Sequence, residues 1–114
     1  MLTLYGIPNC NSMKKARSWL DEQQLEYRFH DYKKAGIDQT TLESWIQQLG
    51  WEPLVNRRGT TWRKLPEEQR EAINERLALQ LMLENPSLIK RPVLQTDKQL
   101  LVGFDVDQWM QALG

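Results

Sequence analysis

Two periods of apolar and polar residues run along the first third of the chain and predict its elements. A short apolar run at 2–5 predicts a buried strand, and alternation over 25–32 predicts a second strand. Between them, apolar side chains recur every three to four residues and predict a helix over 11–24. Its inner residues are Met13, Ala16 and Leu20, with Trp19 as a further candidate. Strand, helix and strand within about thirty residues are typical of a βαβ unit with parallel strands.

The pattern then becomes helical. After a loop at 33–36, a helix is predicted to begin near Thr40, because Thr40 and Glu43 fit a capping box. Leu42, Trp45, Ile46 and Leu49 follow at helical spacing. Gly50 is the expected C-cap.

Residues 51–65 show no clean period, and a second helical region follows them. Pro66 stands at a first-turn position of this region. Asn74 is a candidate cap, so the region is one helix or two. Asn85-Pro86 is predicted to end it, because a residue before proline disfavours helix.

The last part of the chain predicts a hairpin and a helix. The stretches 93–96 and 99–102 flank a turn at Asp97-Lys98 and predict the only antiparallel pair that the pattern indicates. Asp105 and Gln108 form a second capping pair. The helix that follows is expected to bury Val106, Trp109, Met110 and Leu113.

Composition narrows the class of protein. The 114 residues are 40% hydrophobic and 26% charged, with 15 basic and 15 acidic side chains, so we expect one soluble domain, 1–114, with a helical insertion at about 38–88. The charge balance gives no reason to expect nucleic acid, and no apolar run is long enough for a membrane span. One cysteine forms no internal disulfide and no signal peptide is evident, which favours a cytoplasmic protein. The sequence says little about the oligomeric state, and a monomer is the simpler expectation. One cysteine and one histidine are too few for a zinc site.

Cys10 is the candidate nucleophile. It stands where the first strand gives way to a helix, in the stretch Gly6-Ile7-Pro8-Asn9-Cys10-Asn11-Ser12. Unpaired backbone N–H groups at a helix start stabilise a thiolate and lower the thiol pKa. The competing interpretation is a small buried hydrophobic residue. His30 lies mid-strand on the polar face and is interpreted as structural rather than as a general base.

A second candidate site is the segment Asn56-Arg57-Arg58-Gly59-Thr60. Arginines beside glycine and threonine can bind an anion, although a solvated turn explains the same composition. Trp51 and Trp62 either flank these arginines or pack in the core, and core packing is the simpler expectation.

Three segments together resemble the ArsC/Spx family of arsenate reductase-like proteins, and within it the small YffB-type proteins. They are Tyr5-Gly6-Ile7-Pro8-Asn9-Cys10 with Ser12, Asn56-Arg57-Arg58-Gly59-Thr60, and Glu84-Asn85-Pro86-Ser87-Leu88-Ile89-Lys90-Arg91-Pro92-Val93. The last is the most specific. The resemblance covers nearly the whole chain. It implies an α/β thioredoxin-like fold, in which a βαβ unit and a ββα unit share a mixed four-stranded sheet with a helical insertion between them.

The resemblance also implies roles for single residues. Cys10 matches the nucleophile, Arg58 and Arg91 match the anion-binding arginines, and Pro92 matches the cis proline of thioredoxin-like folds. Arg57 competes with Arg58 for the same register. Around the sulfur, hydrogen-bond donors are expected from Asn9, Asn11 and Ser12.

Two departures from the family pattern shape the expected function. Arsenate reductases of the family place a third arginine just after the last hairpin strand, where this chain has Leu101-Val102-Gly103-Phe104-Asp105. Spx regulators carry a second cysteine where this chain has Met13. With no second cysteine in the chain, a thiol from outside must resolve a covalent intermediate.

We therefore expect a thiol-disulfide oxidoreductase that uses glutathione as co-substrate, with no bound cofactor and with glutaredoxin as a possible partner. Glutathione carries two carboxylates, which arginines bind well. The alternatives are an Spx-like protein that contacts RNA polymerase, and a weak arsenate reductase.

Overall fold

The computed structural model describes residues 1–113, and these form two compact units. Unit 1 contains Met1–Asp31 and the chain from Arg91 onward, and unit 2 is Tyr32–Lys90. The second unit corresponds to the predicted insertion and begins several residues earlier than the expected 38. Among the described residues, no helix is long and apolar enough to cross a membrane.

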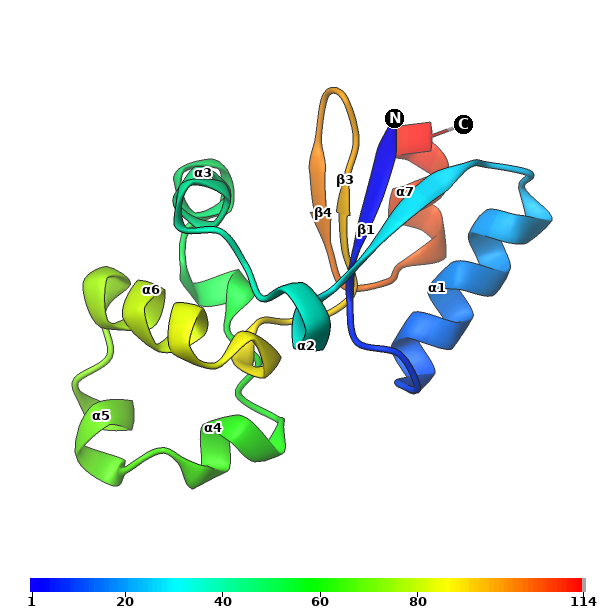
Figure 1. Ribbon diagram of the computed structural model, residues 1–114. Helices are drawn as coiled ribbons and strands as arrows, with labels where there is room; N and C mark the ends of the chain where they lie inside the picture. The colour runs from blue at the N-terminus through cyan, green and yellow to red at the C-terminus, as the bar shows by residue number, and fades with distance from the viewer. Residues whose placement is uncertain (114) are drawn as a thin grey trace. The chain divides into compact units, whose positions relative to one another are not determined.

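Unit 1 is built on a mixed four-stranded sheet (Figure 1). Its elements are β1 (Leu2–Gly6), α1 (Asn11–Glu22), β2 (Tyr27–Asp31), β3 (Val93–Gln95), β4 (Leu100–Val102) and α7 (Val106–Leu113). The strand order is β2-β1-β3-β4. β1 pairs in parallel with β2, as the βαβ pattern predicts, with Leu4 opposite Phe29. The α/β fold class is thereby confirmed.

The predicted hairpin is confirmed in position, but it is not the only antiparallel strand pair of the sheet. β3 pairs antiparallel with β4, and β1 also pairs antiparallel with β3, with Leu4 opposite Leu94. This second pair joins segments from opposite ends of the chain, and local sequence patterns do not reveal such partners.

The core of unit 1 lies between the sheet and helices α1 and α7. It consists of Leu4, Leu94 and Leu101 from the strands, Met13, Ala16, Trp19 and Leu20 from α1, and Trp109 from α7. The rings of Trp19 and Trp109 meet edge to face with centroids 5.9 Å apart. The inner face predicted for α1 is confirmed.

The predicted inner face of α7 is only partly right. Asp105 accepts a hydrogen bond from the backbone N–H of Gln108 at 3.1 Å, as the capping pattern predicts. Trp109 is fully buried, whereas Val106 and Met110 remain 45% and 47% exposed. Ala112 and Leu113 pack against the core beside Trp109, so the buried face of this eight-residue helix is narrower than predicted.

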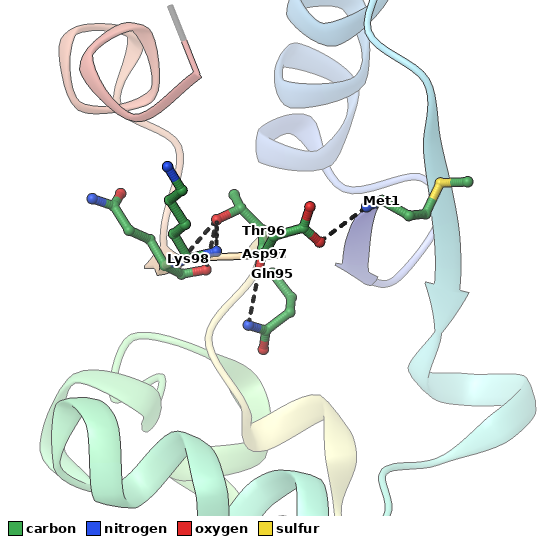
Figure 2. A network of polar contacts seen from close by, with 6 residues as sticks. Met1, Gln95, Thr96, Asp97 and Lys98 are labelled. Carbon is green, nitrogen blue, oxygen red and sulfur yellow. Dashed lines mark hydrogen bonds and ion pairs between the residues drawn. The ribbon is translucent and has the colours of Figure 1, made fainter.

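The hairpin turn is held by side-chain hydrogen bonds, which Figure 2 shows from close by. The hydroxyl of Thr96 accepts from the backbone N–H groups of Lys98 and Gln99 at 3.1 and 2.8 Å. The N-terminal ammonium of Met1 forms an ion pair with Asp97 at 3.1 Å. This pair is exposed and is therefore worth little stability.

Unit 2 is entirely helical in its regular elements. They are α2 (Tyr32–Ala35), α3 (Gln39–Leu49), the 3₁₀ helix η1 (Glu52–Leu54), α4 (Thr60–Lys64), α5 (Glu67–Glu71), α6 (Glu75–Glu84) and the 3₁₀ helix η2 (Pro86–Leu88). The predicted division at Asn74 is confirmed, because its side chain accepts from the N–H of Leu77 at 2.9 Å and caps α6. Gly50 ends α3 with φ +83°, as predicted.

Two local predictions for unit 2 are wrong. The cap of α3 is Asp38, which accepts from the N–H of Thr41 at 3.1 Å, and not Thr40. Residues 33–35 of the loop expected at 33–36 belong to the one-turn helix α2. Its first residue, Tyr32, is 1% exposed and anchors the turn, and Gly36 ends it with φ +64°.

The segments around Val55 and Ile89 pair as a single antiparallel bridge within unit 2. Both side chains are buried. The backbone N–H of Asn56 donates to the carbonyl of Leu88 at 2.8 Å, and that of Lys90 donates to the carbonyl of Leu54 at 2.7 Å. This bridge fixes the arginine-containing segment to the residues that lead out of the unit.

Candidate active site

The turn between β1 and α1 presents Cys10, and Figure 1 shows it as the short link from the blue strand to the first helix. Asn9 adopts a left-handed φ of +70°, which asparagine tolerates better than most residues. Cys10 is extended and is itself the N-cap of α1, and its carbonyl accepts from the N–H of Lys14 at 2.9 Å. The cysteine therefore occupies the N-cap position, and Asn11 is the first residue of the helix.

The side chain of Met13 packs against this turn at Gly6. This side chain is 1% exposed, and a Cβ placed on Gly6 would lie 2.2 Å from its sulfur. Only glycine fits at position 6 while Met13 keeps this position. The residue that stands in place of a second cysteine is thus a packing residue of the core.

The environment of Cys10 favours the thiolate. Burial alone raises the pKa of the Cys10 thiol, but the backbone N–H groups of Met13 and Ser12 and the guanidinium of Arg91 lower it. The lowering contributions prevail, so the pKa of Cys10 lies below its ordinary value. The side chain is half-buried against the core and retains partial exposure. Partial exposure and a lowered thiol pKa are properties that nucleophilic cysteines share.

Arg91 and Pro92 lie at the start of β3 in the same unit. The Arg91–Pro92 peptide bond is cis, as the resemblance implied. The carbonyl of Pro92 accepts from the N–H of Gly103 at 2.8 Å, which ties this turn to the end of β4. Arg91 is half-buried and interacts with the sulfur of Cys10 both by hydrogen bonding and by charge. The structure therefore brings these two predicted site residues together.

The other residues predicted around the sulfur differ in what they offer. Ser12 acts on Cys10 through its backbone N–H. Asn9 and Asn11 lie on either side of Cys10 with exposed side chains. Their role as donors to sulfur or substrate stays a prediction.

Arg58 lies in unit 2, at the segment paired with Ile89, and its side chain is exposed. Asn56 shapes this segment, because its side chain accepts from the backbone N–H of Arg58 at 3.2 Å. Arg63 donates from Nη2 to the carbonyl of Arg58 at 2.8 Å. The backbone of Arg58 is held while its guanidinium has no ion-pair partner among the described residues of the unit.

The neighbouring Arg57 is held by two indoles. Its guanidinium carbon lies 5.8 Å from the ring centroid of Trp51 and 5.4 Å from that of Trp62. Both rings are half-buried. The expectation that these two tryptophans pack in the core is therefore wrong, because both are only half-buried and both lie close to Arg57. Their spacing around the arginines was the signal that could have shown this.

His30 lies against Tyr5, with ring centroids 4.8 Å apart. Burial raises the pKa of Tyr5. Within residues 1–113, no three His, Cys, Asp or Glu side chains gather in a way that could hold a metal ion.

A βαβ unit and a ββα unit around one mixed sheet, with a cysteine at the start of α1, define a thioredoxin-like protein. The sequence model of the ArsC family matches residues 5–112, and the chain belongs to that family.

Three relatives show the range of the family. A solved protein called YffB shares 50% identity over all of both chains, with a TM-score of 0.96. An arsenate reductase (ArsC) related protein from Brucella melitensis shares 50% identity over 96% of this chain and 92% of its own, with a TM-score of 0.78. The global transcriptional regulator Spx of Enterococcus faecalis is 33% identical over 95% of this chain and 83% of its own. The chain is thus similar both to a protein described as related to arsenate reductase and to a transcriptional regulator.

Proposed function

We propose that this protein is a glutathione-dependent thiol reductase with Cys10 as its single nucleophile. The observation that carries the proposal is the convergence on one partly exposed sulfur of two backbone N–H groups and the Arg91 guanidinium. This environment lowers the pKa of the Cys10 thiol and so favours the thiolate, which is the reactive form.

The reaction has two exchange steps. The Cys10 thiolate attacks the glutathione sulfur of a mixed disulfide, a Cys10–glutathione disulfide forms, and the substrate leaves as a thiolate. A second glutathione thiolate then attacks the glutathione sulfur of this adduct, which releases oxidised glutathione and restores the Cys10 thiolate. An external thiol is required because Cys10 is the only cysteine. Glutaredoxin is a candidate for the same second step.

Arg91 and Arg58 have separate roles in this proposal. Arg91 favours the thiolate and provides a guanidinium for a carboxylate near the sulfur, and Arg58 is the second proposed carboxylate ligand. Met13 stands where Spx regulators carry a second cysteine, so no side chain of this chain can form an internal disulfide with Cys10.

Intact-mass analysis after treatment with oxidised glutathione tests the proposal. We expect one added glutathione on the wild type, none on Cys10→Ser, and removal of the adduct by reduced glutathione. A wild-type chain that stays unmodified would contradict it.

The similarity to Spx supports a second candidate, a protein that binds RNA polymerase. A direct binding measurement with purified polymerase separates the two. Tight binding that persists in Cys10→Ser would favour the regulator, because such binding needs no thiol chemistry.

A further inference from the structure

A pocket in unit 2 is not explained by the chemistry of Cys10. It has a volume of about 280 Å³ and is lined by Val55, Asn56, Arg57, Arg58 and Lys90. Three of these five residues are cationic and none is acidic. The sequence pattern indicated the two arginines but gave no reason to join Lys90 to them.

The backbone bridge explains why Lys90 belongs to this pocket. Val55 and Ile89 pair, and the hydrogen bonds from Asn56 to Leu88 and from Lys90 to Leu54 extend the pairing on both sides. Lys90 is thereby fixed beside the arginine segment although it is distant in sequence. Val55 and Ile89 are both buried, so the pairing that brings Lys90 close to Arg57 and Arg58 is part of the packed core of this unit.

The charges in this pocket are unbalanced. Arg58 and Lys90 are exposed and form no ion pair with a described residue of unit 2. Arg57 is also exposed, and its guanidinium carbon lies 5.8 and 5.4 Å from the ring centroids of Trp51 and Trp62, so cation–π contacts help to position its charge. Like charges held close together repel one another, and an anion placed among them relieves this repulsion.

The size of the pocket indicates what kind of anion fits. A volume of about 280 Å³ equals the share of roughly nine liquid water molecules, at about 30 Å³ each. A lone inorganic ion fills a small part of it. Val55 adds an apolar lining, and Asn56 adds an amide. An organic molecule that carries a carboxylate suits this mixture of charge, size and lining.

We propose that this pocket is a carboxylate-binding site for an organic acid, in which Lys90 and Arg58 are the ligands and Arg57 is a fixed positive charge. The identity of the acid rests on the proposed function, which makes it glutathione. The new assignment is the role of Lys90 and of the pocket that the bridge forms around it.

Binding of S-methylglutathione tests this assignment, because the blocked sulfur cannot react with Cys10. The dissociation constant is measured by ¹H–¹⁵N NMR titration for the wild type, Lys90→Gln and Arg58→Gln. Matched controls are Lys64→Gln and Arg76→Gln, exposed cations of the same unit outside the pocket. The same compound with both carboxyl groups esterified is the ligand control.

We expect shifts at 55–59 and 88–90 that the diester does not produce. Lys90→Gln and Arg58→Gln should each weaken binding about three- to fivefold, the range for a solvent-accessible charge pair, and more salt should weaken wild-type binding further. The two controls should stay within about twofold of the wild type.

The proposed carboxylate site would be overturned if Lys90→Gln had the same dissociation constant as the control variants. It would also be overturned if the diester produced the same chemical-shift changes as S-methylglutathione. The Cys10 adduct, measured by intact mass on wild type and Lys90→Gln with saturating oxidised glutathione, keeps the two proposals distinct. An adduct with no shifts at 88–90 would leave the reductase standing and refute the pocket. Shifts at 88–90 with a carboxylate but no adduct would support the pocket and refute the reductase.

Discussion

At the scale of single residues, Cys10 is the position where backbone geometry and charge act on one atom. Asn9 turns the chain with a positive φ, Cys10 is the N-cap residue of α1, and the backbone N–H groups of Ser12 and Met13 lower the pKa of its thiol. Arg91 adds a full positive charge. Helix start and arginine together outweigh the effect of burial, which alone would favour the neutral thiol.

The rate at which iodoacetamide alkylates Cys10 should therefore rise with pH and show its inflection below the free-thiol pKa of about 8.5. Arg91→Gln removes the guanidinium and should move the inflection upward, because the thiolate loses its charged partner. Rates measured against pH decide this, with Arg28→Gln as an exposed arginine control. An inflection at or above the free value in the wild type would contradict an activated cysteine.

The same lowered pKa links folding stability to pH. Because the folded-state pKa lies below the unfolded value, the thiolate's contribution is fully present above about pH 8.5 and is lost as pH falls through the folded pKa. The difference in unfolding free energy between wild type and Cys10→Ser should rise with pH across this window. Urea unfolding at several pH values measures it, and a difference that is constant with pH would refute the link.

Replacement of Gly6 should lower the stability of the fold next to Cys10. Gly6→Ala brings a Cβ to 2.2 Å from the sulfur of Met13, which must move in a packed core. Overpacking of this kind costs about 1–3 kcal/mol in unfolding free energy. Urea unfolding checks the loss, and Met13→Ala should be less harmful in the Gly6→Ala background than in the wild type. Additive losses would show that the two residues do not compete for space.

At the scale of elements, the sequence predicted most of unit 1 because its signals are local. β1, α1 and the hairpin have clear periods, and the apolar face of α1 is the buried one. The helix α7 and the burial of Trp109 were predicted correctly, but the inner face was drawn too wide, since Val106 and Met110 are exposed. The pairing of β1 with β3 and the bridge of Val55 with Ile89 join distant segments, which a local pattern does not encode.

The candidate site divides in the same way. Cys10 could be found from its place between strand and helix, and Arg91 from the resemblance. Lys90 could not, because its nearness to Arg58 follows from a long-range backbone pairing. The choice of Asp38 over Thr40 as a cap escaped prediction because both are polar residues near the start of the same apolar stripe.

The caps of unit 2 should be worth measurable stability. Asp38→Ala and Asn74→Ala each leave a helix N–H without its side-chain acceptor, and each should lower the unfolding free energy by about 1 kcal/mol. Thr40→Ala tests the rejected cap and should change stability much less. Chemical unfolding of the three variants decides between Asp38 and Thr40, and an equal loss at Thr40 would overturn the assignment.

At the scale of the whole molecule, membership of the ArsC family raises the question of arsenate itself. The chain has cationic groups in both units, Arg91 in one and Arg58 with Lys90 in the other. The segment after β4 begins with Gly103 at φ +77° and continues with Phe104, which packs against Trp109 with ring centroids 4.9 Å apart. Where the family resemblance leads us to expect a third arginine in an arsenate reductase, this chain has an aromatic contact against the core.

We therefore expect slow or absent arsenate reduction with glutathione and glutaredoxin. A missing charged hydrogen bond costs about 1.5–3 kcal/mol, which weakens oxyanion binding roughly tenfold to a hundredfold. The measurement is arsenite formation at matched protein concentration beside a dedicated reductase, with Cys10→Ser as the blank. Turnover equal to that of the dedicated enzyme would contradict this expectation.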